Sequence, residues 1–288
     1  MLSLSQIESF IALVDAGSFQ RAAEQLGCSQ PHISQQIKKL EAQLGVHLVS
    51  RTGGGPRLTR DGHAFLPNAR SLLLSASRAE QGIRERDFVI AASSNIGVYL
   101  LPPLIASFAE AHRLRQRMQI RIGTNREALD RARSGEADVA LTEWSEELHG
   151  FDWMPWRREK LVAIVSQRHP FAAQTRVKKA ALLTQHFIGG EPGTGTGRVL
   201  RTLFGESMSS LKIGLELGST AAVKEAVKAN LGISIVLESS VREERSSGSL
   251  KVLEIEEADI YKSLYAVLPR EVPANSLSRA FVAHIAQA

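Results

Sequence analysis

Three short stretches of this 288-residue sequence place serine, threonine or glycine directly after an apolar run. They are ASSNIG at 92–97, EPGTGTGR at 191–198 and LGSTAA at 217–222. Each falls where a predicted strand ends and a helix begins, and the first turn of a helix offers unpaired N–H groups to an anion. We therefore expect these junctions to bind a small anionic molecule. The alternative is that the hydroxyls only cap their own helices.

The candidate ligand-binding residues come from these junctions and from the end of a further predicted strand, DVAL. They are Ser93, Ser94, Asn95, Ile96, Thr142, Glu143, Gly193, Thr194, Gly195, Thr196, Arg198, Ser219 and Thr220. In a parallel sheet, the carboxyl ends of the strands meet at one edge, where ligands bind. The sequence thus predicts one cleft lined by segments that are far apart along the chain.

Other kinds of chemistry lack the residues they need. Arg198 occupies the position where a dinucleotide-binding G-x-G-x-x-G needs glycine or alanine, and no G-K-[ST] marks a P-loop. Cys28 and His32 have metal-ligand spacing, but no second cysteine or nearby histidine completes a set. Glu143 has no evident partner for acid–base catalysis. We expect no metal, no cofactor and no enzymatic activity; an enzyme acting on a small acid, or Cys28 as a redox sensor, is the weaker alternative.

Near the N-terminus, two predicted helices present a polar outer face. Phe19, Ala22 and Leu26 repeat at helical spacing, and so do Ile33 and Ile37 after the turn around Gly27. A helix, a short turn and a second helix predict a helix-turn-helix, and HLVSRTGGGPRLT after it predicts a β-wing. The expected DNA contacts are Ser18, Gln20, Gln30, Pro31, His32, Ser34, Gln35, Lys38, Arg51 and Arg57. The alternative is an ordinary helical bundle with a solvated face.

The charge distribution favours DNA binding. Residues 28–60 carry Lys38, Lys39, Arg51, Arg57 and Arg60 against one acid, whereas residues 87–288 carry 25 basic and 23 acidic residues. Excess positive charge is therefore concentrated beside the predicted helix-turn-helix.

Residues 17–62, GSFQRAAEQLGCSQPHISQQIKKLEAQLGVHLVSRTGGGPRLTRDG, resemble the N-terminal signature of LysR-type transcriptional regulators. Gln35 and Gly54 depart from it where members often carry a basic residue. The resemblance implies a regulator that binds double-stranded promoter DNA as a homodimer or homotetramer, contacts RNA polymerase, and responds to an effector between two lobes. GGEPGTGTGR also resembles an element of one branch of the family that senses small anionic metabolites, although Gly190 and Gly197 replace its flanking arginines.

The order of elements predicts an α/β chain with three parts. These are an all-α winged helix-turn-helix (1–58), a linker and dimerisation helix (59–86), and a two-lobe α/β domain like a periplasmic solute-binding protein (87–288). Lobe I is expected at about 87–161 and 266–288, and lobe II at about 162–265. The alternation predicts a mostly parallel, doubly wound sheet. Pro67 should kink or shorten the linker helix.

The chain lacks a long uncharged apolar stretch and an apolar signal core, and has a single cysteine. We therefore expect a cytoplasmic protein without a membrane partner. A solute receptor for transport is a third alternative, which the missing export signal disfavours.

Overall fold

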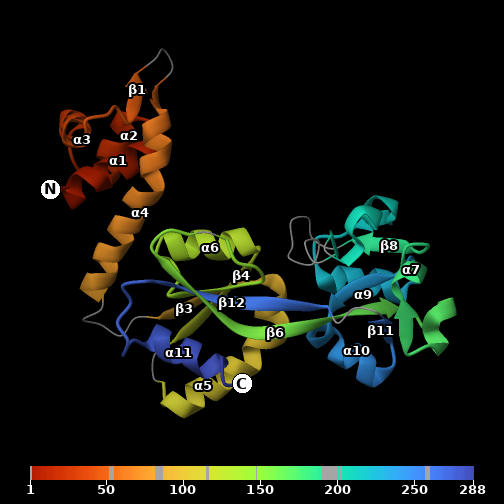
Figure 1. Ribbon diagram of the computed structural model, residues 1–288. Helices are drawn as coiled ribbons and strands as arrows, with labels where there is room; N and C mark the ends of the chain where they lie inside the picture. Colours follow the sequence, from red (N-terminus) through yellow and green to blue (C-terminus); the bar gives the residue numbers. More distant parts are fainter. Residues whose placement is uncertain are drawn as a thin grey trace. The chain divides into compact units, whose positions relative to one another are not determined.

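The computed structural model describes residues 2–51, 55–81, 87–114, 117–146, 148–189, 200–201, 203–256 and 260–288. The chain divides into two compact units, Met1–Asp87 with Arg133–Glu136 and Phe88–Ala132 with Ala137–Ala288 (Figure 1). The first unit is helical with a small wing, and the second mixes helices and strands. The predicted α/β class with a helical N-terminal part is confirmed.

The N-terminal unit is built from α1 (Leu4–Ala16), α2 (Phe19–Gln25), α3 (Gln30–Leu44), β1 (Val49–Arg51), β2 (Pro56–Leu58) and α4 (Arg60–Gln81). Its core contains the fully buried residues Phe10 of α1, Ala22 of α2, and Ile33 and Leu40 of α3. Ile33 and Leu40 are seven positions apart and so lie on the same face of α3. Gly45 ends α3 in the left-handed conformation, with φ of 71°, which glycine adopts without steric cost. Local sequence signals therefore define the limits of these helices.

β1 and β2 pair antiparallel, so the predicted wing is confirmed. Glu41 Oε1 accepts hydrogen bonds from the main-chain nitrogens of Leu48 (2.8 Å) and Val49 (3.1 Å). Thr59 Oγ1 donates to the carbonyl of His47 (2.6 Å) and accepts from Gly62 N (3.0 Å). A Cβ on Gly62 would lie 2.1 Å from the Leu48 carbonyl oxygen, so only glycine fits there. These contacts fix the wing relative to α3 and α4.

Of the two effects expected from Pro67, a kink or a shortening of the linker helix, the shortening is wrong, because α4 continues through Pro67 from Arg60 to Gln81. Proline removes the one hydrogen bond that the carbonyl of His63 would accept. Both residues are exposed, so water can reach that carbonyl. Arg70 Nη2 donates to Asp15 Oδ1 (2.6 Å) and joins α4 to the end of α1.

In the second unit, lobe I contains β3 (Phe88–Ser93), η1 (Ile96–Leu100), α5 (Leu101–His112), β4 (Met118–Gly123), α6 (Asn125–Arg133), β5 (Val139–Thr142) and α11 (Leu277–Ile285). β3 lies between β4 and β5 and is parallel to both. Ile90, Phe108, Leu141 and Phe281 are fully buried in its core.

Lobe II contains η2 (Pro170–Ala173), β7 (Arg176–Lys178), α7 (Lys179–Leu182), β8 (His186–Gly189), η3 (Gly205–Ser210), β9 (Lys212–Glu216), α9 (Thr220–Lys228), β10 (Ser234–Leu237), η4 (Glu238–Val241), α10 (Arg242–Ser247) and β11 (Lys251–Glu256). Its cores bury Phe187, Val227 and Leu253. β8 and β9 are parallel.

Two long strands connect the lobes: β6 (Phe151–Val165) and β12 (Tyr261–Pro269) run antiparallel, side by side in Figure 1. Trp156 and Leu264 belong to the lobe I core, whereas Leu161 and Ile260 belong to a lobe II core. Each of the two strands therefore passes from one lobe core to the other. The sheet is mixed rather than mostly parallel, because β10, β11 and β12 are all antiparallel to β6.

Among the helices that the structure describes, none combines the length and the hydropathy of a membrane span.

Candidate functional site

α3 presents most of the predicted DNA contacts to solvent. Its exposed residues include Gln30, Pro31, His32, Gln35 and Lys38, whereas Ser34 is half-buried. Ser29 caps α3 by accepting a hydrogen bond from the main-chain nitrogen of His32 (3.4 Å). The apolar residues of α3 face the core, and its opposite face is exposed within the N-terminal unit.

The other predicted DNA contacts flank α3. Gln20 is exposed on α2 and donates to Glu24 Oε1 (3.2 Å). Ser18 precedes α2, half-buried, and its hydroxyl makes no capping hydrogen bond. Arg57 is exposed on β2, and the side chain of Arg51 lies outside the described residues. The predicted DNA-contact residues that the structure describes thus lie at or just before α2, on α3 and on the wing.

In lobe I, a buried polar cluster lies where β3 and β5 end. Ser93 Oγ donates to Glu143 Oε1 (3.0 Å), and Lys262 of β12 forms an ion pair with Glu143 Oε2. These three residues are 3%, 5% and 2% exposed. Burial lowers the pKa of Lys262 below its ordinary value of 10.5, and the negative charge of Glu143 opposes that shift.

The sequence suggested no acid–base partner for Glu143 and gave no indication of its ion pair with Lys262, which lies against it. A signal was available: Lys262 shares its strand face with Leu264, Ala266 and Leu268, which are all buried. A lysine in phase with core residues must find a counter-charge. Asn125, also missed, accepts a hydrogen bond from Glu143 N at its Oδ1 (2.7 Å).

Two of the three predicted junctions meet across the lobes. Thr220 Oγ1, at the start of α9 in lobe II, donates to Asn95 Oδ1 in lobe I (2.7 Å). Asn95 is 8% exposed, and Thr220 is half-buried. This hydrogen bond brings together residues that are 125 positions apart.

The remaining predicted ligand residues have varied surroundings. Ser219 Oγ caps α9 by accepting from Ala222 N (3.2 Å), and Ser94 Oγ donates to the Gly123 carbonyl (3.0 Å). Thr142 is fully buried and donates to the Trp144 carbonyl (3.1 Å), while the side chain of Ile96 lies in the lobe I core. Gly193, Thr194, Gly195, Thr196 and Arg198 lie outside the described residues.

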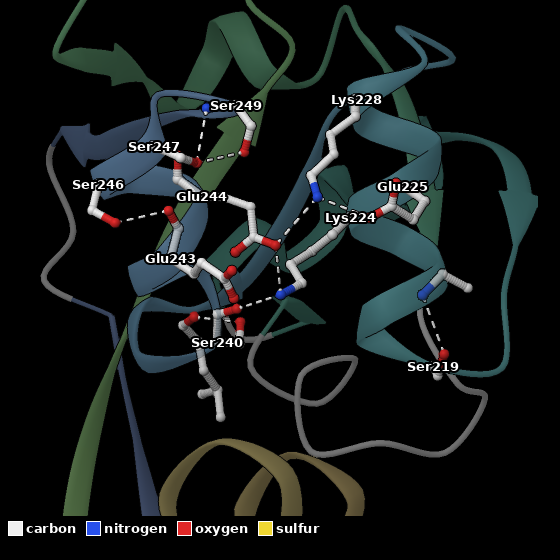
Figure 2. Close-up of polar contacts among 12 residues, drawn as sticks. Ser219, Lys224, Glu225, Lys228, Ser240, Glu243, Glu244, Ser246, Ser247 and Ser249 are labelled. Atoms are coloured by element: carbon white, nitrogen blue, oxygen red, sulfur yellow. Dashed lines mark hydrogen bonds and ion pairs between the residues drawn. The ribbon is translucent and has the colours of Figure 1, made fainter.

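A second contact between the lobes involves Lys224, about one helical turn after Thr220 on α9. Lys224 Nζ lies 4.9 Å from the ring centroid of Tyr99, on η1 of lobe I. Within lobe II it donates to the Ser240 carbonyl (2.9 Å) and pairs with Glu244 Oε1 (2.8 Å). Figure 2 shows Lys224 and Lys228 of α9 converging on Glu244 of α10.

Glu244 stays ionised despite its burial. Burial raises the pKa of this carboxyl, but hydrogen bonds from Lys224, the main chain and Lys228 outweigh it, so the pKa lies below the ordinary 4.5. The Lys224 ammonium therefore has a charged partner in lobe II and an aromatic face in lobe I. Both contacts between the lobes depend on where α9 lies relative to η1.

Comparisons with known proteins agree with this architecture. The family description "Bacterial regulatory helix-turn-helix protein, lysR family" matches residues 4–63, and "LysR substrate binding domain" matches residues 81–288. The HTH-type transcriptional regulator protein PtxE of Stutzerimonas stutzeri is 38% identical over 196 residues, 68% of this chain and 100% of that protein.

Two solved structures show the same fold. Full-length CbnR complexed with its target DNA is 23% identical, with a TM-score of 0.70 and coverage of 99% of each chain. The regulatory domain of Synechocystis PCC6803 CcmR in complex with 2-PG is 22% identical, with a TM-score of 0.62, covering 70% of this chain and 96% of that one. A DNA-binding helix-turn-helix followed by a two-lobe substrate-binding domain is the architecture of LysR-type transcriptional regulators, and the chain belongs to that family.

Proposed function

We propose that this regulator works in the cytoplasm without catalysis and that a small anionic metabolite, bound between lobes I and II, controls its binding to promoter DNA. The two lobes are those expected at about 87–161 with 266–288 and at about 162–265. The observation that carries the proposal is the hydrogen bond from Thr220 to Asn95, which joins two ligand-type junctions across the lobes.

An anion at this point would compete for that hydrogen bond. The Thr220 hydroxyl and the Asn95 amide can both donate to an anion, and α9 begins at Thr220, where its dipole favours negative charge. Replacing a direct bond between the lobes with a bridging ligand changes the relative stability of two lobe arrangements, which is what control by an effector requires. The CcmR regulatory domain, which has the same fold, is described in complex with 2-PG.

On the DNA side, α3 is the proposed reader. Gln30 and Gln35 can each pair with adenine in the major groove, and Lys38 is suited to a phosphate. Arg57 on the wing can follow the adjacent minor groove. We propose that the DNA-bound regulator affects transcription by contacting RNA polymerase at the promoter.

We also propose a homo-oligomer. Ile120 and Ile122 are 37% and 46% exposed on β4, which ends the sheet of lobe I, and Ile213 and Leu215 are 46% and 39% exposed on β9. Apolar side chains on edge strands favour association with another chain. Ile122→Asp and Ile213→Asp should each lower the molar mass measured by light scattering, and an unchanged mass in both would contradict this interface.

The effector proposal can be tested by intrinsic fluorescence. The three tryptophans, Trp144, Trp153 and Trp156, all belong to the effector-binding unit, and Trp144 follows Glu143 directly. Titration with a panel of sulfate, phosphate, 2-PG and small organic acids should change the emission for at least one anion. Thr220→Val should weaken that response about tenfold or more, as expected for the loss of a hydrogen bond to a charged group.

Thr184→Val is the matched control, because Thr184 is exposed in lobe II and its described hydrogen bonds are local: it donates to the Ala181 carbonyl and accepts from Gln185 Nε2. The active anion should also change the affinity for a DNA fragment from upstream of the gene itself. An anion response that Thr220→Val leaves intact would place the ligand elsewhere.

A further inference from the structure

A cavity of about 460 Å³ lies beside the crossing strand β6, and it shares no residue with the effector site proposed above. β6 residues 157–160 line one side, where they pair with β12. β10 ends opposite Leu161, and the chain then turns into η4 and α10, which line the other side. The cavity therefore lies between a strand that connects the lobes and two helices of lobe II.

The lining is strongly basic: five arginine or lysine residues face two glutamates. Three of these cations are already paired. Arg157 pairs with Glu159, Arg245 with Glu238 (2.8 Å), and Lys160 with Glu254 (2.9 Å).

Two guanidinium groups of the lining have no counter-charge among the described residues. Arg158 stacks on the ring of Tyr261, 4.8 Å from its centroid, and forms no ion pair with a described residue. Arg242, at the start of α10, is exposed and has no polar partner within the described part of the chain. Stacking holds the Arg158 guanidinium in a fixed orientation without neutralising it.

A buried hydroxyl lies in the same lining. Ser239 is 6% exposed, and its Oγ has no hydrogen-bond partner among the described atoms. Buried hydroxyls in native proteins almost always have a partner, and a small rotation of the Ser239 side chain would let a molecule in the cavity supply one. This observation is independent of the charge of the cavity.

We propose that the cavity is a second anion site, which binds a phosphate group through Arg158, Arg242 and Ser239. Guanidinium groups match phosphate oxygens in geometry, and two uncompensated positive charges suit a dianion. The volume exceeds what one phosphate needs and lies within the range of about 300–1,000 Å³ typical of small-molecule sites. A phosphomonoester therefore fits the cavity better than free phosphate. Bound there, it joins β6 to η4 and α10.

The test is calorimetric titration of the full-length protein with inorganic phosphate and, separately, with glycerol 3-phosphate at ionic strength held constant with sodium chloride. Arg242→Gln should weaken binding of the better probe about tenfold or more. Arg168→Gln is the matched control, because Arg168 is exposed in the same lobe and its side chain forms no hydrogen bond or ion pair with a described residue; it should bind like the parent. Tighter binding of the ester identifies an organic phosphate as the ligand, and equal affinity identifies inorganic phosphate.

Ser239→Ala separates a ligand contact from a structural one. Removing an unpartnered buried hydroxyl should leave thermal stability unchanged or higher, while anion binding weakens about tenfold. Thr220→Val should retain this binding, because Thr220 belongs to the other site. Equal weakening by Arg242→Gln and Arg168→Gln, loss of binding in Thr220→Val alone, or no heat from either probe would each overturn the proposal.

Discussion

The two units of this regulator place their charged groups in opposite ways. In the described part of the N-terminal unit, the buried polar residues are Gln6 and Ser9, and neither is charged. In the effector-binding unit, six charged residues are buried: Asp138, Glu143, Glu159, Lys224, Glu244 and Lys262. A surface that binds a polyanion needs its charges in solvent, where they can displace counterions. A domain that changes between two arrangements can use buried ion pairs, because each is sensitive to small displacements of its partner.

The largest effect is expected from Lys262→Met, which leaves the Glu143 carboxylate buried without its cation. Breaking a buried pair in this way typically costs about 3–5 kcal/mol. Urea unfolding followed by tryptophan fluorescence reports this loss, since all three tryptophans lie in the effector-binding unit. Lys251→Met, at an exposed lysine of β11, is the control. Adding Glu143→Gln should restore much of the stability. If Lys262→Met lowers the free energy of unfolding no more than the control does, the ion pair does not contribute to stability.

A smaller loss of folding stability is expected from Glu244→Gln, which keeps the shape of the side chain but removes its charge. Hydrogen bonds to charged groups contribute about 1.5–3 kcal/mol. The folded-state pKa of Glu244 lies below its ordinary value of 4.5, so the unfolded chain takes up a proton first as the pH falls. The contribution of the carboxylate is thus present above about pH 4.5 and is lost as the pH falls through the folded-state pKa.

Denaturant unfolding of parent and variant between pH 3 and pH 7 checks this sign, since the difference between them should shrink toward acid pH, within roughly the range where carboxyl groups titrate. Glu243→Gln, at the exposed neighbouring residue, should show no such convergence.

On the DNA-binding unit, Gln30→Ala and Lys38→Ala should separate sequence reading from positioning. Loss of a base contact by Gln30→Ala should cost about 1–3 kcal/mol on the specific site and little on unrelated DNA. Lys38→Ala should weaken binding to the specific site and to unrelated DNA alike, and it should reduce the slope of log affinity against log salt by about 1. Fluorescence anisotropy with the upstream DNA fragment measures both, with Gln43→Ala, at an exposed residue near the end of α3, as the control. Identical behaviour of the two variants would contradict the proposed division of roles.

The smallest effect is expected from Arg70→Gln, which removes the exposed ion pair with Asp15. The two side chains are 51% and 47% exposed, so solvent screens their attraction. Such pairs contribute about 0.2–1 kcal/mol, and less at high salt. Thermal unfolding of the N-terminal unit, followed by circular dichroism, should show a slightly lower melting temperature for the variant than for the parent in low salt. This difference should disappear in high salt. A loss as large as that of Lys262→Met would remove the contrast between the two units.

The sequence alone determined the DNA-binding unit almost completely. Its signals are local: the spacing of Ile33, Ile37 and Leu40 defines the buried face of α3, and Gly45 ends the helix. In a helix, one face follows from the spacing along the chain, so the outward residues are known once the phase is known. The expected lobe limits also implied that the chain passes twice between the lobes, but the four consecutive charged residues 157–160 gave no strand pattern in the middle of β6.

Only the tertiary structure decided which residues meet in the effector-binding unit. Glu143 and Lys262 form an ion pair although they are 119 positions apart in the sequence. The cavity near Ser239 is likewise lined by distant segments, residues 157–160 of β6 and residues of η4 and α10. Periodicity shows which face of a strand is buried, but strand order and crossing decide what lies opposite. The sequence therefore predicted a ligand cleft and a DNA-reading helix, while the pairing of distant strands decided which charges are buried together.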